Sequence, residues 1–252
     1  MKSSLKISLL ATAAASAFAT TAGATVVFNE TFESYTLGDA NGQGGWVDFG
    51  GDLLTNIVDT RANGGSQSIE FGTEAVPPAG DQYGSDSTLD LDDPITSGQL
   101  AFSFDIYQPT GFDGQSNVYL SRGRTNAPDF NFDLGMNLIG NGSTGVFSVD
   151  GLATSTPIQF DQWVSVLVDI DLDADTAVAT YGGVEIYNGV WARDVGTTPI
   201  QYQGLNVWAN GTGANASQFN VDNLRLEIIP EPSGVALLGL AVFGLALRRR
   251  RA

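Results

Sequence analysis

A two-sheet antiparallel β-sandwich of the jelly-roll type is the fold that the 252-residue sequence predicts for residues 25–229. Apolar and polar residues alternate along several segments there, and long helical periodicity is absent. Glycine accounts for 31 residues, and many glycines follow an asparagine, which is typical of tight turns between short strands. About ten to thirteen strands are expected, enough for two packed sheets around one core.

Three segments show this alternation most clearly, each with its apolar side chains expected on one face of a strand. They are residues 99–108, with Leu100, Phe102, Phe104 and Ile106; residues 130–138, with Phe130, Phe132, Leu134, Met136 and Leu138; and residues 164–170, with Val164, Val166, Val168 and Ile170. Successive side chains of a strand point to opposite faces, so these segments are expected to be half-buried antiparallel strands.

The last segment, residues 218–229, changes phase in its middle. Its apolar residues are odd-numbered at first and even-numbered afterwards: Phe219 and Val221, then Leu224, Leu226 and Ile228. A β-bulge inserts one extra residue into a strand, and a bulge at Asp222-Asn223 would keep both sets on the core face.

Charge separates the middle of the chain from its ends and excludes several functions. Residues 25–229 hold five arginines, no lysine and 27 acidic residues, a net charge of −22, against −17 for the whole chain. This acidity argues against a nucleic-acid partner. The chain also has no Cys and no His, which excludes disulfides, thiolate nucleophiles, Ser-His-Asp triads and the usual zinc sites.

The N-terminus predicts a signal peptide over residues 1–24. Lys2 and Lys6 precede an uncharged Leu- and Ala-rich run that ends in Ala22-Gly23-Ala24, so cleavage is expected after Ala24. The general secretion machinery would then export the chain. A retained N-terminal membrane anchor is the alternative.

The C-terminus combines three parts: Pro230-Glu231-Pro232, an uncharged apolar stretch over residues 233–247, and the arginines 248–251. A helix over this stretch would be about 22 Å long, against a hydrocarbon core of about 30 Å, and could span the inner membrane with local thinning. The positive-inside rule keeps Arg248, Arg249, Arg250 and Arg251 in the cytoplasm and places residues 25–229 on the exported side.

This arrangement closely resembles the PEP-CTERM sorting signal. The resemblance implies that Pro230, Glu231 and Pro232 are recognised by an exosortase, a membrane transpeptidase that cuts near the motif. It also implies a transient inner-membrane anchor over residues 230–252, followed by a cell-surface or extracellular location. A simple tail anchor, in which the two prolines only interrupt the chain before the helix, is the alternative.

The exported part carries a second resemblance. The segments 28–46, 65–69, 163–181 and 219–226 resemble the strand sequences of concanavalin A-like and laminin G-like jelly-roll domains. The resemblance implies carbohydrate binding, glycoside hydrolysis or plain adhesion, and the fold alone does not decide among them.

Carboxylates are the candidates for catalysis and metal binding. Glycosidases of this architecture resemble one another in a Glu-x-Asp-x-x-Glu strand, and this sequence contains no such string. Glu70, Asp105 and Glu185 are therefore only nominal catalytic candidates. Asp171, Asp173 and Asp175 could hold Ca²⁺, although a solvated hairpin turn at residues 173–176 explains them as well. A second acidic cluster, Asp90, Asp92 and Asp93, is interpreted as another solvated turn.

Sugar binding would use exposed aromatic rings beside amide groups. The candidates are Trp208, Trp191, Tyr119 and Tyr202, with Asn206 and Asn210 as polar neighbours. Trp208 is opposite in phase to Leu205 and Val207, which predicts an outward side chain. Trp46 and Trp163 are expected in the core instead.

Together these observations predict a non-enzymatic, lectin-like module of the cell surface or extracellular matrix that contacts polysaccharide. A glycoside hydrolase or lyase based on carboxylates is the first alternative. A purely structural surface protein without a specific ligand is the second.

Overall fold

The computed structural model describes residues 23–49, 54–72, 83–124, 132–150, 152, 154–193, 198–210 and 218–230. All the regular secondary structure in these ranges consists of strands. In chain order they are β1 (Thr25–Glu30), β2 (Gly38–Asp39), β3 (Val47–Asp48), β4 (Asn56–Val58), β5 (Ser68–Gly72), β6 (Tyr83–Ile95), β7 (Gln99–Tyr107), β8 (Gln115–Arg124), β9 (Phe132–Asn141), β10 (Val146–Val149), β11 (Ser155–Pro157), β12 (Trp163–Asp171), β13 (Thr176–Tyr181), β14 (Val184–Val190), β15 (Tyr202–Asn210) and β16 (Gln218–Ile229).

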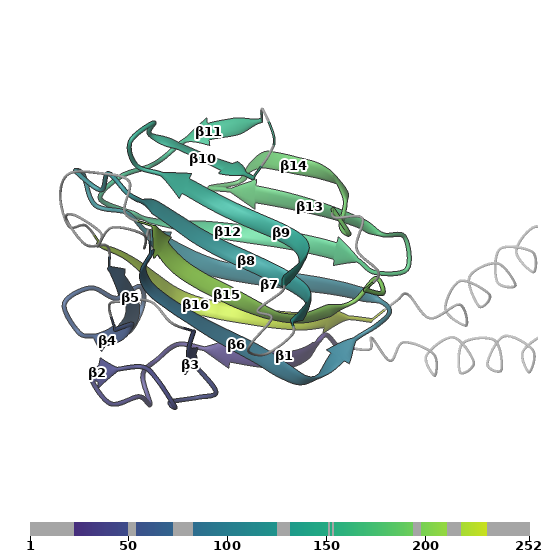
Figure 1. Cartoon of the computed structure of the whole chain (residues 1–252), viewed down its shortest axis with the longest axis horizontal. Helices are drawn as coiled ribbons and strands as arrows, with labels where there is room; N and C mark the ends of the chain where they lie inside the picture. The colour runs from purple at the N-terminus through teal and green to yellow at the C-terminus, as the bar shows by residue number, and fades with distance from the viewer. Residues whose placement is uncertain are drawn as a thin grey trace, which may run out of the picture. The chain divides into compact units, whose positions relative to one another are not determined.

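These strands form two sheets, which confirms the predicted all-β sandwich (Figure 1). The nine-stranded sheet has the order β14-β13-β12-β7-β16-β5-β4-β2, with β1 also paired to β16. The seven-stranded sheet has the order β11-β10-β9-β8-β15-β6-β3 and lies in front in Figure 1. There are more strands than expected because several, such as β2 and β3, are pieces of two or three residues at the sheet ends.

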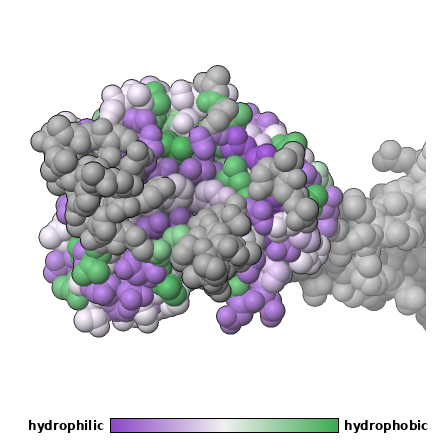
Figure 2. Space-filling view, in the orientation of Figure 1, coloured by the Kyte–Doolittle hydropathy of each residue, from purple (hydrophilic) through white to green (hydrophobic). Residues whose placement is uncertain are grey.

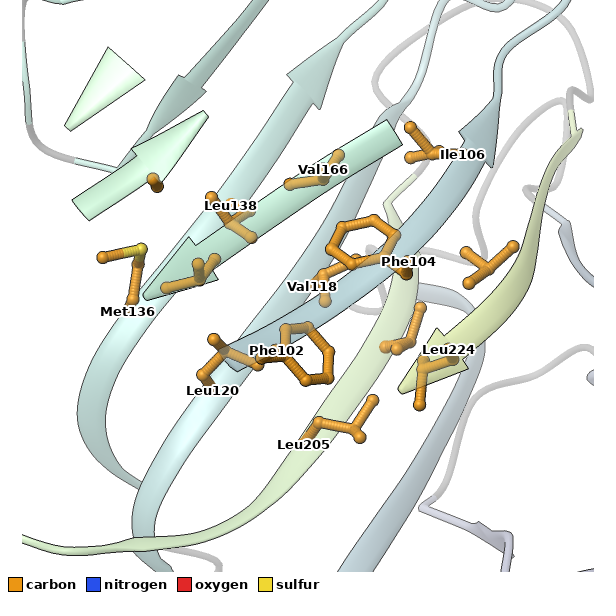
Figure 3. Packing of buried hydrophobic residues seen from close by; sticks show 14 of the residues in the cluster. Phe102, Phe104, Ile106, Val118, Leu120, Met136, Leu138, Val166, Leu205 and Leu224 are labelled. Carbon is orange, nitrogen blue, oxygen red and sulfur yellow. The ribbon is translucent and has the colours of Figure 1, made fainter. Parts of the chain in front are cut away.

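The core lies between the sheets, where the predicted apolar faces meet. On the nine-stranded sheet β7 and β12 are in register, with Phe104 opposite Val166 and Phe102 opposite Val168. From the other sheet, Val118 and Leu120 of β8 and Met136 and Leu138 of β9 point toward them (Figure 3). Each of these side chains is at most 1 % exposed, so the alternation identified the core face of these strands.

The segment 130–138 follows its prediction only in part. Met136 and Leu138 lie in the core, whereas Leu134 is half-buried outside the core cluster and Phe130 lies outside the described residues. The pairing with β8 shifts register between Leu120 and Gly123, opposite this part of β9. A strict alternation therefore does not continue through Leu134.

The predicted bulge in β16 is present. Asn223 has φ of 50°, the left-handed conformation that interrupts a strand locally. Phe219 and Val221 before it and Leu224 and Leu226 after it are all fully buried. The extra residue thus restores the core face, as the change of phase predicted.

The terminal predictions fall mostly outside the described residues. Residues 1–22 of the predicted signal peptide 1–24, Ala22 included, lie there, as do Glu231, Pro232, the apolar stretch 233–247 and the arginines 248–251. Within the described ranges no helix is long and apolar enough to cross a membrane. The residues Val26–Ile228 form one compact unit, which contains both sheets.

Candidate functional site

The outer face of the seven-stranded sheet gathers three of the predicted ligand-binding residues. In β15, Leu205, Val207 and Ala209 are buried in the core, which turns Asn206 and Trp208 to the opposite face. In β8, Val118 and Leu120 point inward, which likewise turns Tyr119 outward. The register places Tyr119 directly opposite Asn206, so the three side chains are neighbours.

Tyr119 and Trp208 form an aromatic pair on this face. Their ring centroids are 6.1 Å apart, with 47° between the ring planes, and both residues are half-buried. Burial raises the pKa of Tyr119, and the nearby Asp133 carboxylate adds to the rise. The phenol therefore stays protonated at neutral pH and can both donate and accept a hydrogen bond.

Three amides surround the aromatic pair. Asn117 of β8 lies opposite Trp208, Asn137 of β9 lies opposite Tyr119, and Asn206 completes the set. Asn117 Nδ2 and Asn137 Oδ1 have no hydrogen-bond partner among the described residues, although the two residues are only 2 % and 6 % exposed. Asn206 is anchored, because its Nδ2 donates to Asp86 Oδ1 at 2.5 Å and to the Ser87 carbonyl at 3.2 Å.

Buried amide atoms that lack partners are uncommon, and at the surface of a sheet they indicate a place for a ligand or ordered water. We call Asn117, Tyr119, Asn137, Asn206 and Trp208 the amide–aromatic face. Hydrophilic residues are visible between the grey atoms in the middle of Figure 2, next to some hydrophobic ones. The arrangement offers ring surface and hydrogen-bonding amides to a polar ligand.

Trp191 and Tyr202, also predicted as ligand-binding residues, are fully buried, so the expectation of exposed rings is wrong for both. Trp191 Nε1 donates to the Gln201 carbonyl at 3.1 Å, and the Trp191 and Tyr202 rings are stacked with centroids 6.4 Å apart. The segment that joins β14 to β15 carries Trp191 into the core, where no alternation could have placed it. Asn210, the remaining candidate, lies at the end of β15 opposite Gln115 of β8.

The acidic turn after β12 has its carboxylates engaged by backbone. Asp171 Oδ1 accepts from the N–H groups of Asp173 and Ala174, Asp173 Oδ2 from Gly98 N, and Asp175 Oδ1 from Ala192 N. Within the described part of the chain no group of three or more acidic residues is arranged to hold a metal ion. Calcium binding at this turn stays a prediction that titration of the protein with Ca²⁺ would test.

The three nominal catalytic carboxylates do not belong to the amide–aromatic face. All three lie in the nine-stranded sheet: Glu185 is exposed on its edge strand β14, Glu70 is on β5 and Asp105 is on β7. Asp105 accepts hydrogen bonds from Asn63 Nδ2 at 2.8 Å, Asn223 Nδ2 at 2.9 Å and Ser165 Oγ at 2.5 Å. Asp105 is thus tied to its neighbours by hydrogen bonds.

Sequence reasoning missed a second polar cluster, centred on Asp222 beside the β16 bulge. This side chain is 1 % exposed, and its two carboxylate oxygens accept from the N–H groups of Asn63 and Asn223, each at 2.7 Å. Burial raises its pKa to about 6; the two N–H groups oppose the rise, and the charges of Asp105 and Glu33 add to it. The bulge was visible in the sequence, but its partner loop was not.

Trp163 was expected in the core but is half-buried on the outer face of the nine-stranded sheet, because Val164 takes the inward phase of β12. Its ring packs against Tyr107 with centroids 5.6 Å apart, and the Arg61 guanidinium lies 4.2 Å over the Tyr107 ring. Trp46, by contrast, is fully buried as predicted.

Comparison with known proteins identifies the C-terminal motif and the class of fold. Residues 229–251 match the PEP-CTERM protein-sorting motif, which confirms the resemblance seen in the sequence. The fold is that of jelly-roll domains found in carbohydrate-active proteins. A comparison with curated proteins finds no match.

Three solved structures illustrate the likeness of fold. The first, a sialidase, has a TM-score of 0.56 at 8 % identity over 81 % of this chain, and the match spans only 18 % of the sialidase. The catalytic domain of a glycoside hydrolase family 131 protein from Coprinopsis cinerea has a TM-score of 0.55 at 14 % identity, covering 82 % of this chain and 95 % of that domain. An alginate lyase solved with an alginate tetrasaccharide has a TM-score of 0.53 at 14 % identity, covering 79 % and 95 %. Identities this low show a common fold and nothing finer.

Proposed function

We propose that this protein is an exported cell-surface or extracellular-matrix protein that binds polysaccharide on its amide–aromatic face. The observation that carries the proposal is the Tyr119–Trp208 ring pair beside Asn117 and Asn137. Among the described residues, Asn117 Nδ2 and Asn137 Oδ1 are buried without a hydrogen-bond partner. A pyranose ring presents an apolar C–H surface that packs on aromatic rings and hydroxyls that pair with amides. A sugar chain would satisfy both parts of this face together.

A carbohydrate-active enzyme is the second candidate, favoured by the fold shared with a glycoside hydrolase catalytic domain and an alginate lyase. Glycoside hydrolysis generally needs two carboxylates about 5 to 9.5 Å apart across the sugar. The two carboxylates noted beside the ring pair are each held by a neighbour: Asp86 accepts from Asn206, and Asp133 accepts from the Thr198 hydroxyl. Sugar binding without catalysis therefore fits the described side chains better than glycoside hydrolysis does.

The replacement Trp208→Ala tests the proposed site. Loss of the ring surface is expected to weaken polysaccharide binding at least about tenfold, equivalent to about 1.4 kcal/mol. Binding of the mature protein to a polysaccharide array, followed by calorimetry with each polymer that binds, measures the effect.

The matched control is Trp163→Ala, which removes an equally half-buried tryptophan from the outer face of the nine-stranded sheet. Its binding should equal that of the unmodified protein. An equal loss in both variants would place the site elsewhere, and no binding to any polymer would leave the purely structural alternative.

Sorting provides an independent prediction. We propose that an exosortase processes the chain at its PEP-CTERM motif after export. Glu231→Ala, or deletion of the arginines 248–251, should leave the protein retained in the inner membrane with its C-terminal segment attached. Fractionation and the intact mass of the mature protein measure this outcome.

The control Glu227→Gln changes an acid just before the motif and should be processed normally. An unchanged mass and unchanged surface display in Glu231→Ala would contradict the proposal.

A further inference from the structure

Acidic side chains lie around the amide–aromatic face. Asp86 of β6 is directly opposite Trp208 and holds the Asn206 amide. Asp90 was interpreted as part of a solvated turn with Asp92 and Asp93, but all three lie within β6. Asp90 is opposite Gly204 of β15, and its Oδ1 would lie 2.4 Å from a Cβ placed on that glycine. Asp133 of β9 adds to the raised pKa of Tyr119, and its carboxylate accepts from the Thr198 hydroxyl. Two carboxylates of β6 thus lie on the ligand side, and the charge of Asp133 on β9 acts on Tyr119.

Arg122 of β8 offsets these charges only in part, because it opposes the rise of the Tyr119 pKa by less than Asp133 adds to it. Arg122 of β8 is 2 % exposed, and its guanidinium donates to the backbone carbonyls of Leu134 at 3.1 Å, Thr198 at 2.6 Å and Pro199 at 3.3 Å. These bonds turn the guanidinium toward residues 198–199, before β15, and join that segment to β8 and β9. Backbone carbonyls therefore fix the position of the guanidinium, which keeps its positive charge.

The other basic residues of residues 25–229 are four arginines, since this stretch contains no lysine and no histidine. Arg61 donates to Asn220 Oδ1 in the nine-stranded sheet, Arg193 to the Asp150 carbonyl, and Arg225 to Glu227. The side chain of Arg124, at the end of β8, is outside the described residues. Each arginine with a described side chain is thus engaged by a neighbour in the fold.

We propose that the ligand of this face is a neutral polysaccharide and that uronic-acid polymers are excluded, an inference that rests on the polysaccharide-binding function proposed above. The face offers amides, a protonated phenol and aromatic rings, all of which pair with hydroxyls and C–H surfaces and carry no charge. A uronate would bring a carboxylate close to Asp86 and Asp90 in a domain of net charge −22, and like charges repel.

The experiment compares two classes of polymer on the mature protein. Dextran, laminarin, galactomannan and xylan represent neutral chains, and alginate and polygalacturonate represent uronates. Affinities are measured by calorimetry at about 0.01 M and about 1 M NaCl, where charges are screened over roughly 30 Å and 3 Å. The variant Trp208→Ala shows in each case whether binding uses the amide–aromatic face.

At low salt a neutral polymer should bind at least about tenfold more tightly than either uronate, and the difference should shrink at high salt because screening weakens the repulsion. Affinity for the neutral polymer should not depend on salt. Tighter binding of a uronate at low salt, abolished by Trp208→Ala, would overturn the inference and leave the polysaccharide-binding function standing. Binding of neither class would overturn the proposed function itself.

Discussion

Gly135→Ala should lower the free energy of unfolding by about 3 kcal/mol, a large effect for a single methyl group. A Cβ at residue 135 of β9 would lie 2.3 Å from Cη2 and 2.4 Å from Cζ2 of Trp191. The tryptophan cannot move aside easily, because it is fully buried, stacked on Tyr202 and held by its hydrogen bond to Gln201. The clash must therefore strain the packed core.

Denaturant unfolding measures this loss, and two comparisons isolate its cause. In a Trp191→Leu background the smaller side chain leaves room, so Gly135→Ala should then cost less than about 1 kcal/mol. Gly123→Ala is a matched control, because a Cβ there would meet its nearest neighbour, Thr198 Cγ2, at 3.1 Å and needs only a slight adjustment. Additive losses in the double variant would show that Trp191 is not the obstacle.

The packing of Trp191 marks where sequence reasoning about the site reaches its limit. Alternation assigned Trp208 and Asn206 to the outer face because Leu205 and Val207 fix the phase of β15. Trp191 lies just after β14, outside any alternating run, so its burial depends on the path of the chain between the two sheets. Local pattern contains no information on such a path.

Strand order explains why Asn117 and Asn137 were missed. The inward phase of Val118 and Leu120 would have turned Asn117 outward beside Tyr119, and this signal was available. Nothing in the sequence shows, however, that β8 lies between β15 and β9, which brings Asn137 and Trp208 to either side of it. The fold class and the bulge follow from local periodicity, whereas the site depends on pairings between strands distant in sequence.

Asp105→Ala should be the second most damaging change, with a loss of about 2 kcal/mol in the free energy of unfolding. It removes the acceptor that Asn63, Ser165 and Asn223 share, so three donors from separate segments lose their partner. Asp105→Asn is the matched variant. Its amide oxygen can still accept from Asn63 and Asn223, and its Nδ2 can donate to the Ser165 hydroxyl, so a loss nearer 1 kcal/mol is expected.

The asparagine variant also tests the coupling between Asp105 and Asp222. The pKa of Asp222 is about 6 in the folded protein and about 4 in an unfolded chain, so the unfolded chain releases this proton first as pH rises. The contribution of Asp222 to stability is therefore fully present below about pH 4 and is lost between about pH 4 and pH 6.

Removing the Asp105 charge takes away one of the causes that raise this pKa, although burial, the largest cause, remains. Stability should accordingly fall less between about pH 4 and pH 7 in Asp105→Asn than in the unmodified protein. Thermal midpoints measured across this range give the two slopes directly. The carboxylates other than Asp105 and Asp222 contribute to both proteins alike, and the same pair of slopes in an Asp222→Asn background separates the part that belongs to Asp222. Equal slopes would mean that the Asp105 charge does not reach Asp222, and that hydrogen bonds alone join the bulge to the loop of Asn63.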